Sequence, residues 1–153
     1  MLLVAAGALV FGSPAYAATP RCNNFGQWSD LRDPPQVDLY MAGYWPASNW
    51  NDATFKCLMS SGDSGDDVKE LQRGLNLCYG SSSGVNLGVK LTVDGQFGPA
   101  TKSALIKAQR YHKLLADGVY APQTAAATWH RGHMLTPYGW YWTCTLASTL
   151  GWR

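Results

Sequence analysis

The side chains that could perform chemistry in this chain are few, and their spacing favours little catalysis. His130 and His133 form an H-x-x-H pattern, which could bring two imidazoles to one metal ion, but no third ligand is placed beside them. We therefore interpret both as surface histidines. His112 is expected to end a helix, where a partial positive charge is favourable.

A cluster of aspartates precedes the first regular segment. Asp63, Asp66 and Asp67 could suggest calcium, yet their spacing does not match an EF-hand loop. Negative side chains also stabilise the N-terminus of a helix. We therefore assign the aspartates to a capped, solvated helix start, and predict no metal site and no cofactor.

The most informative pattern is a short phrase that occurs twice. Asp94–Thr101 reads D-G-Q-F-G-P-A-T, and Asp117–Thr124 reads D-G-V-Y-A-P-Q-T. Asp-Gly favours a turn, and Pro is suited to the first turn of a helix. The aromatic residue can pack back on that helix as a hydrophobic staple. Each copy therefore predicts a turn that leads into a helix, while Phe97 and Tyr120 could each turn one ring edge toward solvent or ligand.

Apolar periodicity predicts three helices around these phrases. The first should cover Asp66–Leu77, after a capping box from Ser64 to Asp67. The second should cover Pro99–His112, and the third, Pro122–Trp129, should be short. Before and after this regular part no helical period is sustained, which predicts loops and short strands in the N-terminal stretch.

Length, charge and the N-terminus limit the class of protein. The 153 residues, 46% of them hydrophobic, suffice for one modest core, and a net charge of +2 gives no basis for strong capture of nucleic acid. Leu2–Phe11 is apolar, and Ala15–Ala17 reads A-Y-A. We predict a signal peptide over residues 1–17, with an uncleaved anchor as the alternative, and no stable membrane span after cleavage.

Four cysteines, all after the predicted signal peptide, indicate two disulfides in an exported chain. Three pairings are possible, and the sequence alone does not choose among them. We expect Cys57–Cys78, which would tie the lead-in segment to the first helix, and Cys22–Cys144, which would join the chain ends. Zinc-binding or catalytic cysteines are the alternative, but no C-x-x-C pair occurs.

Residues 59–129 contain a series of short motifs: Gly62–Val68, Leu71-Gln72, Leu75-Asn76, Leu91–Thr101, Gln109, Asp117–Val119 and Pro122–Thr124. In this order they resemble the peptidoglycan-binding-like domain of bacterial cell-wall proteins. The resemblance implies a three-helix bundle that binds peptidoglycan non-covalently. Two positions depart from the family: Ala108 stands where Phe is usual before Gln109, and Ala121 where Gly is usual.

The resulting fold prediction is mainly α, a compact three-helix bundle with irregular, disulfide-tied extensions at both ends. We predict a signal peptide (1–17), an aromatic-rich N-terminal extension (18–58), the binding domain (59–129) and an aromatic C-terminal tail packed on that domain (130–153). The tail contains Trp140, Tyr141 and Trp142. Side chains alternate along a strand, so these rings cannot all face inward, and they serve either as core cover or as ligand surface.

The predicted function is that of a secreted, non-catalytic cell-wall protein. Its expected partner is peptidoglycan, through either the glycan or the stem peptide, because aromatic rings contact sugar faces while amides and carboxylates bond polar groups. The predicted ligand residues are Asp94, Gln96, Phe97, Gln109, Tyr111, Asp117 and Tyr120. A module that holds an exported protein partner is the alternative. A small wall hydrolase is a third reading, but the flanks are too short for a catalytic domain.

Overall fold

The computed structural model describes residues 19–30, 37–44, 54–81 and 83–150. The predicted signal peptide, residues 1–17, lies outside these ranges. Within them, no helix is long and apolar enough to cross a membrane.

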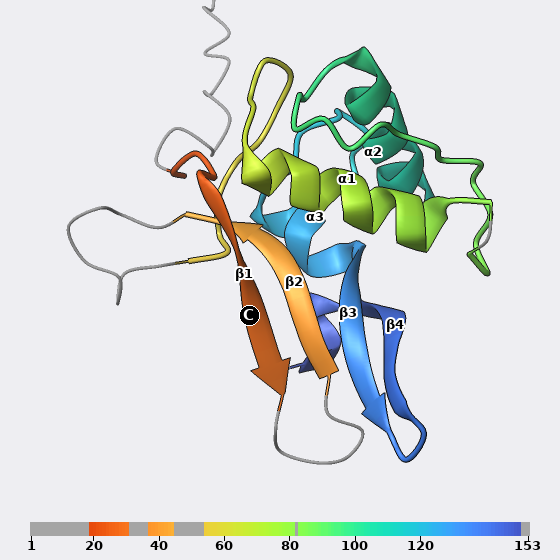
Figure 1. Cartoon of the computed structure of the whole chain (residues 1–153). Coiled ribbons are helices and arrows are strands. Elements are labelled where there is room, and N and C mark those ends of the chain that lie inside the picture. The colour runs from red at the N-terminus through yellow and green to blue at the C-terminus, as the bar shows by residue number, and fades with distance from the viewer. Residues whose placement is uncertain (1–18, 31–36, 45–53, 82, 151–153) are drawn as a thin grey trace, which may run out of the picture.

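The chain combines helices with an antiparallel sheet. The elements are, in order, β1 (Asn24–Asp30), β2 (Val37–Gly43), α1 (Asp66–Tyr79), α2 (Pro99–Tyr111), α3 (Pro122–Ala127), β3 (Trp129–Thr136), β4 (Gly139–Leu146) and the 3₁₀ helix η2 (Ala147–Leu150). The sheet order is β1-β2-β3-β4, with every neighbouring pair antiparallel. Figure 1 shows the α-helices gathered at one end of this sheet, with α1 crossing it.

The prediction of a mainly α, three-helix bundle is therefore wrong. The described residues contain three α-helices, but the two flanks, expected to be irregular, build the sheet together: β1 and β2 come before the helices, and β3 and β4 follow them. Strand β2 pairs with β3 across about ninety residues of sequence, Leu39 opposite Gly132. Single-sequence periodicity missed this pairing because it reports local amphipathicity and not which distant segments meet.

The core side of the sheet follows strand alternation. Leu39 and Met41, two residues apart on β2, are buried, as are His130 and Gly132 on β3. Side chains at i and i+2 share one face of a strand, so these four positions lie on one face. The opposite face also contributes to the hydrophobic core, through Ala42, Trp129 and Cys144, and Cys144 bonds Cys78 of α1 there.

The helices begin where the sequence predicts and end differently. Helix α1 extends two residues beyond the predicted Leu77, to Tyr79. Its N-cap is Gly65 and makes no side-chain cap hydrogen bond, so the predicted capping box is wrong. Helix α3 is shorter than predicted, because Trp129 already belongs to β3.

One buried glutamine holds the first copy of the doubled phrase. The Nε2 of Gln72 donates to Asp94 Oδ1 (2.8 Å), to the Gln96 carbonyl (3.1 Å) and to Thr101 Oγ1 (3.1 Å). Its Oε1 accepts the N–H of Gly95 at 2.9 Å. Gly95 has a φ of +75°, which an L side chain rarely adopts, so the Asp-Gly pair is required by the turn.

The second copy repeats this arrangement with Gln109. Its Nε2 donates to Asp117 Oδ1 (3.0 Å), the Val119 carbonyl (3.0 Å) and Thr124 Oγ1 (3.2 Å). Its Oε1 accepts the N–H of Gly118 at 2.9 Å. The two copies are thus one structural unit used twice, in which a helical glutamine fixes the turn that starts the next helix.

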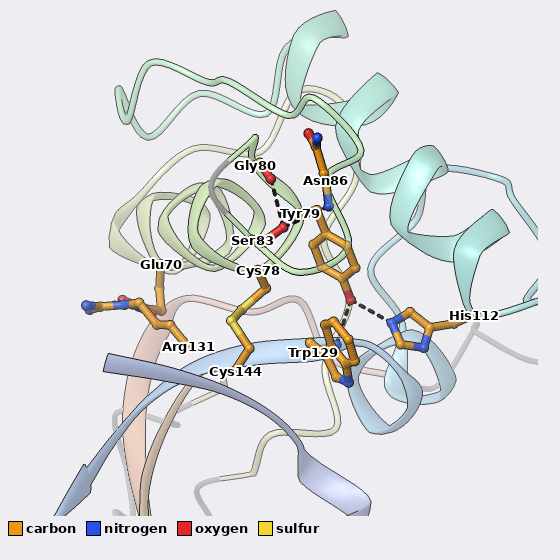
Figure 2. The surroundings of a disulfide bond; sticks show 10 residues. All are labelled: Glu70, Cys78, Tyr79, Gly80, Ser83, Asn86, His112, Trp129, Arg131 and Cys144. Atoms are coloured by element: carbon orange, nitrogen blue, oxygen red, sulfur yellow. Dashed lines mark hydrogen bonds and ion pairs between the residues drawn. A yellow bond between two sulfur atoms is a disulfide. The ribbon is translucent and has the colours of Figure 1, made fainter. Parts of the chain in front are cut away.

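All four cysteines form disulfides, but the predicted pairing is wrong. The bonds are Cys22–Cys57 and Cys78–Cys144. An isolated parallel bridge between Arg21 and Leu58 brings the first pair together. The second pair joins the C-terminal end of α1 to β4, as Figure 2 shows. The disulfide of the tail therefore goes to α1 and not to the N-terminal segment, with which the tail pairs through β2 and β3 instead.

Candidate functional site

Three of the predicted ligand residues are buried in the fold. Phe97 is 2% exposed, Gln109 0% and Tyr120 1%. Both aromatic rings of the doubled phrase face the core, as in a hydrophobic staple. The side-chain amide of Gln109 is hydrogen-bonded to the second turn. Burial also raises the pKa of the Tyr120 hydroxyl. These side chains cannot touch a ligand in this structure, and their assignment as contact residues is corrected accordingly.

Asp94 and Gln96 remain exposed and border a groove at the start of α2. We call it the α2 groove; it measures about 340 Å³ and is lined by Gln72, Lys90, Leu91, Thr92, Asp94, Gln96, Gly98, Pro99, Ala100 and Thr101. The side-chain hydrogen bond from Gln72, with the N–H of Gln96, lowers the pKa of Asp94. That carboxylate is therefore ionised at neutral pH and accepts hydrogen bonds.

The N-terminus of helix α2 adds hydrogen-bond donors to this groove. Gly98 caps the helix without a side-chain bond, and Pro99 occupies its first turn. The first amides of any helix lack intrahelical acceptors, and Ala100 and Thr101 line the groove at that level. Together with Lys90, these groups give one side of the groove a preference for negative charge.

The remaining two predicted residues, Tyr111 at the end of α2 and Asp117 in the second copy, do not line the α2 groove. Asp117 is half-buried and bonds Gln109 and the N–H of Val119. Tyr111 is exposed, with its ring centroid 5.8 Å from that of Trp129. The structure therefore brings together Asp94 and Gln96 but does not unite all seven predicted residues in one site.

The two histidines of the H-x-x-H pattern point to opposite faces of β3, because they are an odd number of residues apart. His130 is buried, so its interpretation as a surface residue is wrong. Its Nε2 donates to the Ala125 carbonyl at 2.6 Å, and burial lowers its pKa to about 4. Among the described residues, no three His, Cys, Asp or Glu side chains come together as metal ligands.

A polar contact inside the aromatic core joins His112 to Tyr79 and Trp129. The Tyr79 hydroxyl accepts the N–H of Trp129 at 2.7 Å and lies 2.8 Å from His112 Nε2, as Figure 2 shows. Since its oxygen already accepts from Trp129, the hydroxyl proton is available to Nε2. Burial lowers the pKa of His112, in keeping with an imidazole that accepts this bond. The cluster joins α1, α2 and β3.

The structure contains a second groove that the sequence did not predict. We call it the α1 groove; it measures about 460 Å³ and is lined by Arg73, Asn76, Leu77, Val93, Arg131 and Trp142. It lies where α1 meets the C-terminal hairpin, so its walls come from segments distant in sequence. The available signal was the pair Arg73 and Leu77, which are exposed one turn apart on α1.

One family model matches the helical part of the chain. Residues 64–127 match the model described as "Putative peptidoglycan binding domain". The resemblance inferred from the sequence is therefore confirmed over this segment. The segment contains α1, α2, α3 and the α2 groove, whereas the four strands lie outside it.

Two individual proteins are similar to parts of the chain. The zinc D-Ala-D-Ala carboxypeptidase of Streptomyces albus G is 39% identical over 71 residues, which make up 46% of this chain and 26% of the relative. The chain thus spans about a quarter of that relative's length. The crystal structure of a peptidoglycan-binding protein from Clostridioides difficile, in complex with glutamine hydroxamate, aligns over 64% of this chain and 53% of its own. Its identity is 23% and its TM-score 0.40, too low to support an argument.

Proposed function

We propose that this protein is an exported, non-catalytic peptidoglycan-binding protein whose primary site is the α2 groove. The family match over residues 64–127 is the observation that carries the proposal, because every residue that lines the α2 groove lies within the matched segment. Export is supported by two disulfides, which persist in oxidising compartments.

The chemistry of the α2 groove suits the stem peptide of the wall. Asp94 and Gln96 offer an ionised acceptor and an exposed amide, which bond peptide groups. Lys90 and the first amides of α2 favour a carboxylate. A stem peptide presents both kinds of group along a short extended chain, so we place it in this groove.

The test is sedimentation of the oxidised protein with insoluble peptidoglycan. We expect the wild type to co-sediment and Gln96→Ala combined with Lys90→Ala to bind about tenfold more weakly, the effect of losing about 1.4 kcal/mol. Gln123→Ala is the matched control, since Gln123 is exposed on α3 at the second copy of the phrase and does not line the groove. A wild-type protein that stays in the supernatant would overturn the proposal, and a double variant that binds normally would move the site elsewhere.

The non-catalytic part of the proposal has a separate test, because the similar carboxypeptidase is matched over a quarter of its length only. We expect purified walls to keep their turbidity and their stem peptides to stay uncut when incubated with the protein, with or without added zinc. Loss of turbidity, or release of D-alanine, would contradict the non-catalytic proposal and show that the protein is a small wall hydrolase.

A further inference from the structure

We propose that the C-terminal hairpin carries a second binding surface, which takes a glycan strand of amino sugars bearing carboxylates. We call this surface the aromatic face; it consists of Tyr40, Arg131, His133, Trp140 and Trp142. The surface lies outside the segment that matches the family. The choice of a wall glycan as occupant rests on the proposed function, whereas the geometry of the surface does not.

The register of the hairpin puts these rings on one side of the sheet. His133 stands opposite Trp142, and Leu135 stands opposite Trp140. Residues directly opposite one another project from the same face, as do residues two apart on one strand. The ring centroid of His133 lies 3.6 Å from that of Trp142 and 6.0 Å from that of Trp140, so the three rings form one continuous surface. Both tryptophans stay about half exposed, at 51% for Trp140 and 50% for Trp142.

Arg131 holds the inner part of this surface in place. Its guanidinium carbon lies 4.9 Å from the Tyr40 ring centroid and 4.5 Å from that of Trp142. The same guanidinium binds the buried carboxylate of Glu70 through two nitrogens, Nη2 at 2.7 Å and Nε. Figure 2 shows this ion pair reaching from α1 to β3. Rings fixed before binding lose less side-chain entropy when a ligand arrives.

The aromatic face continues into the α1 groove, since Arg131 and Trp142 belong to both. Arg73 lies on the helical wall of the groove, and its Nη1 is 3.7 Å from Glu70. Two arginines thus contact one buried carboxylate, so Arg73, Arg131 and Glu70 together carry one net positive charge, while Asp38, opposite His133 in the register, adds a carboxylate to the aromatic face. A ligand that meets the rings and extends along α1 is therefore favoured if it carries a carboxylate.

The kind of ring decides between ligand classes. The surface is made of Trp, Tyr and His, which combine flat apolar faces with polar edges. A sugar ring is the complementary shape, with an apolar face and hydroxyl groups around its edge. A strand of such rings matches a row of aromatic side chains on a flat hairpin, and lactyl or peptide carboxylates on that strand match the arginine pair.

Neighbouring residues of β4 supply a matched control. Tyr141 lies between the two tryptophans and is equally exposed, at 50%, but it projects from the opposite face of the sheet. Trp142→Ala and Trp140→Ala therefore remove rings from the aromatic face, whereas Tyr141→Ala removes a ring of similar exposure from the other side. Disulfide mapping and far-UV circular dichroism verify that each variant is folded.

The first experiment titrates the oxidised protein with a β-1,4-linked N-acetylglucosamine hexamer and follows the tryptophan indole N–H signals by NMR. We expect binding that weakens about tenfold in Trp142→Ala and Trp140→Ala, the usual scale for an aromatic anchor, and that changes less than twofold in Tyr141→Ala. Trp142→Phe should recover part of the loss because it keeps a ring. No shift in the wild type, or equal loss in Tyr141→Ala, would overturn the inference.

The second experiment separates this inference from the proposed function. If the wild type sediments with peptidoglycan and the tryptophan variants sediment equally well, the proposed glycan site on the aromatic face is overturned. The proposed binding site in the α2 groove is then retained. If the wild type does not sediment but binds the hexamer at the tryptophans, the proposed function falls and the glycan surface stands. Binding of phosphatidylglycerol vesicles that is lost in Trp142→Ala, without hexamer binding, would assign the rings to a lipid surface and overturn the glycan.

Discussion

The helical segment and the sheet use their polar and aromatic residues in opposite ways. In the helical segment, the most recognisable residues have structural roles: Gln72 and Gln109 fix two turns, and Phe97 and Tyr120 fill the core. In the hairpin, Trp140 and Trp142 belong to no repeated motif, yet they are half exposed. A conspicuous pattern in a sequence can therefore describe construction, while the accessible chemistry lies in a less patterned region.

The largest expected effect on stability comes from removing the disulfide that links the helical segment to the hairpin. Replacing Cys78 and Cys144 by serine opens the disulfide between α1 and β4, which closes a separation of 66 residues. A loop of that length predicts a loss of about 4 kcal/mol in the free energy of unfolding. Urea denaturation measures it, followed by tryptophan fluorescence for the hairpin and circular dichroism for the helices. If the regions depend on each other as the bond suggests, both probes should shift together, and an unchanged midpoint would contradict this.

The next effect tests the doubled phrase inside the helical segment. Gln72→Ala and Gln109→Ala should each lower the free energy of unfolding by about 3 kcal/mol, because each leaves a buried Gly N–H and other partners unsatisfied. Thermal and urea unfolding measure this loss. The exposed Gln96→Ala should stay within about 0.5 kcal/mol of the wild type. Unequal losses for the two glutamines would mean that the two copies are not energetically equivalent.

A smaller effect, dependent on pH, comes from the core side of the sheet. Burial lowers the folded-state pKa of His130 from 6.5 to about 4, so the folded state resists protonation. The stabilisation is present above pH 6.5 and is lost as the pH falls toward 4. By pH 5 the free energy of unfolding should have dropped by about 2 kcal/mol from this residue.

The measurement is urea unfolding at a series of pH values for the wild type and His130→Gln. The variant should show a flatter profile between pH 6.5 and 4, although it is less stable at neutral pH. The pKa of His112 is lowered in the same direction by burial, so some slope below pH 6.5 remains in the variant. Identical profiles for the two proteins would contradict the assignment to His130.

The smallest expected effect on stability belongs to the exposed rings. Trp140→Ala and Tyr141→Ala should each change the free energy of unfolding by less than about 1 kcal/mol, because both side chains are half exposed. Their effects on glycan binding should nevertheless differ, since they lie on opposite faces of β4. Thermal unfolding gives the stability, and a large loss of stability in Trp140→Ala would show that this ring supports the fold.

Local chemistry made several features predictable. The starts of α1, α2 and α3 follow from acidic residues or Pro at the first helical positions, which act within one turn. The rule that three consecutive aromatics cannot share a face also applies, since Tyr141 projects away from Trp140 and Trp142. The predicted domain boundaries at residues 17, 58 and 129 stay a prediction, although the family match at 64–127 falls inside the third segment.

The errors concern contacts between distant segments. The pairing of the cysteines depended on a bridge from Arg21 to Leu58 and on the hairpin folding under α1, neither of which leaves a local signature. Of the predicted ligand residues, Asp94 and Gln96 are exposed because the turn leaves them outside, and their role in binding stays a prediction. The α1 groove was not predictable from the sequence, because Arg73 and Arg131 meet only through Glu70.

By itself, the sequence determined two turn-into-helix units, a family resemblance and an even set of cysteines. Each of these rests on interactions within a few residues or on composition, so no knowledge of the distant chain is needed. The tertiary structure alone decided that Phe97, Gln109 and Tyr120 are buried, that the flanks form one sheet, and that the hairpin turns Trp140 and Trp142 outward. Burial is a property of the assembled molecule, because a side chain is covered only when segments far apart in sequence pack against it.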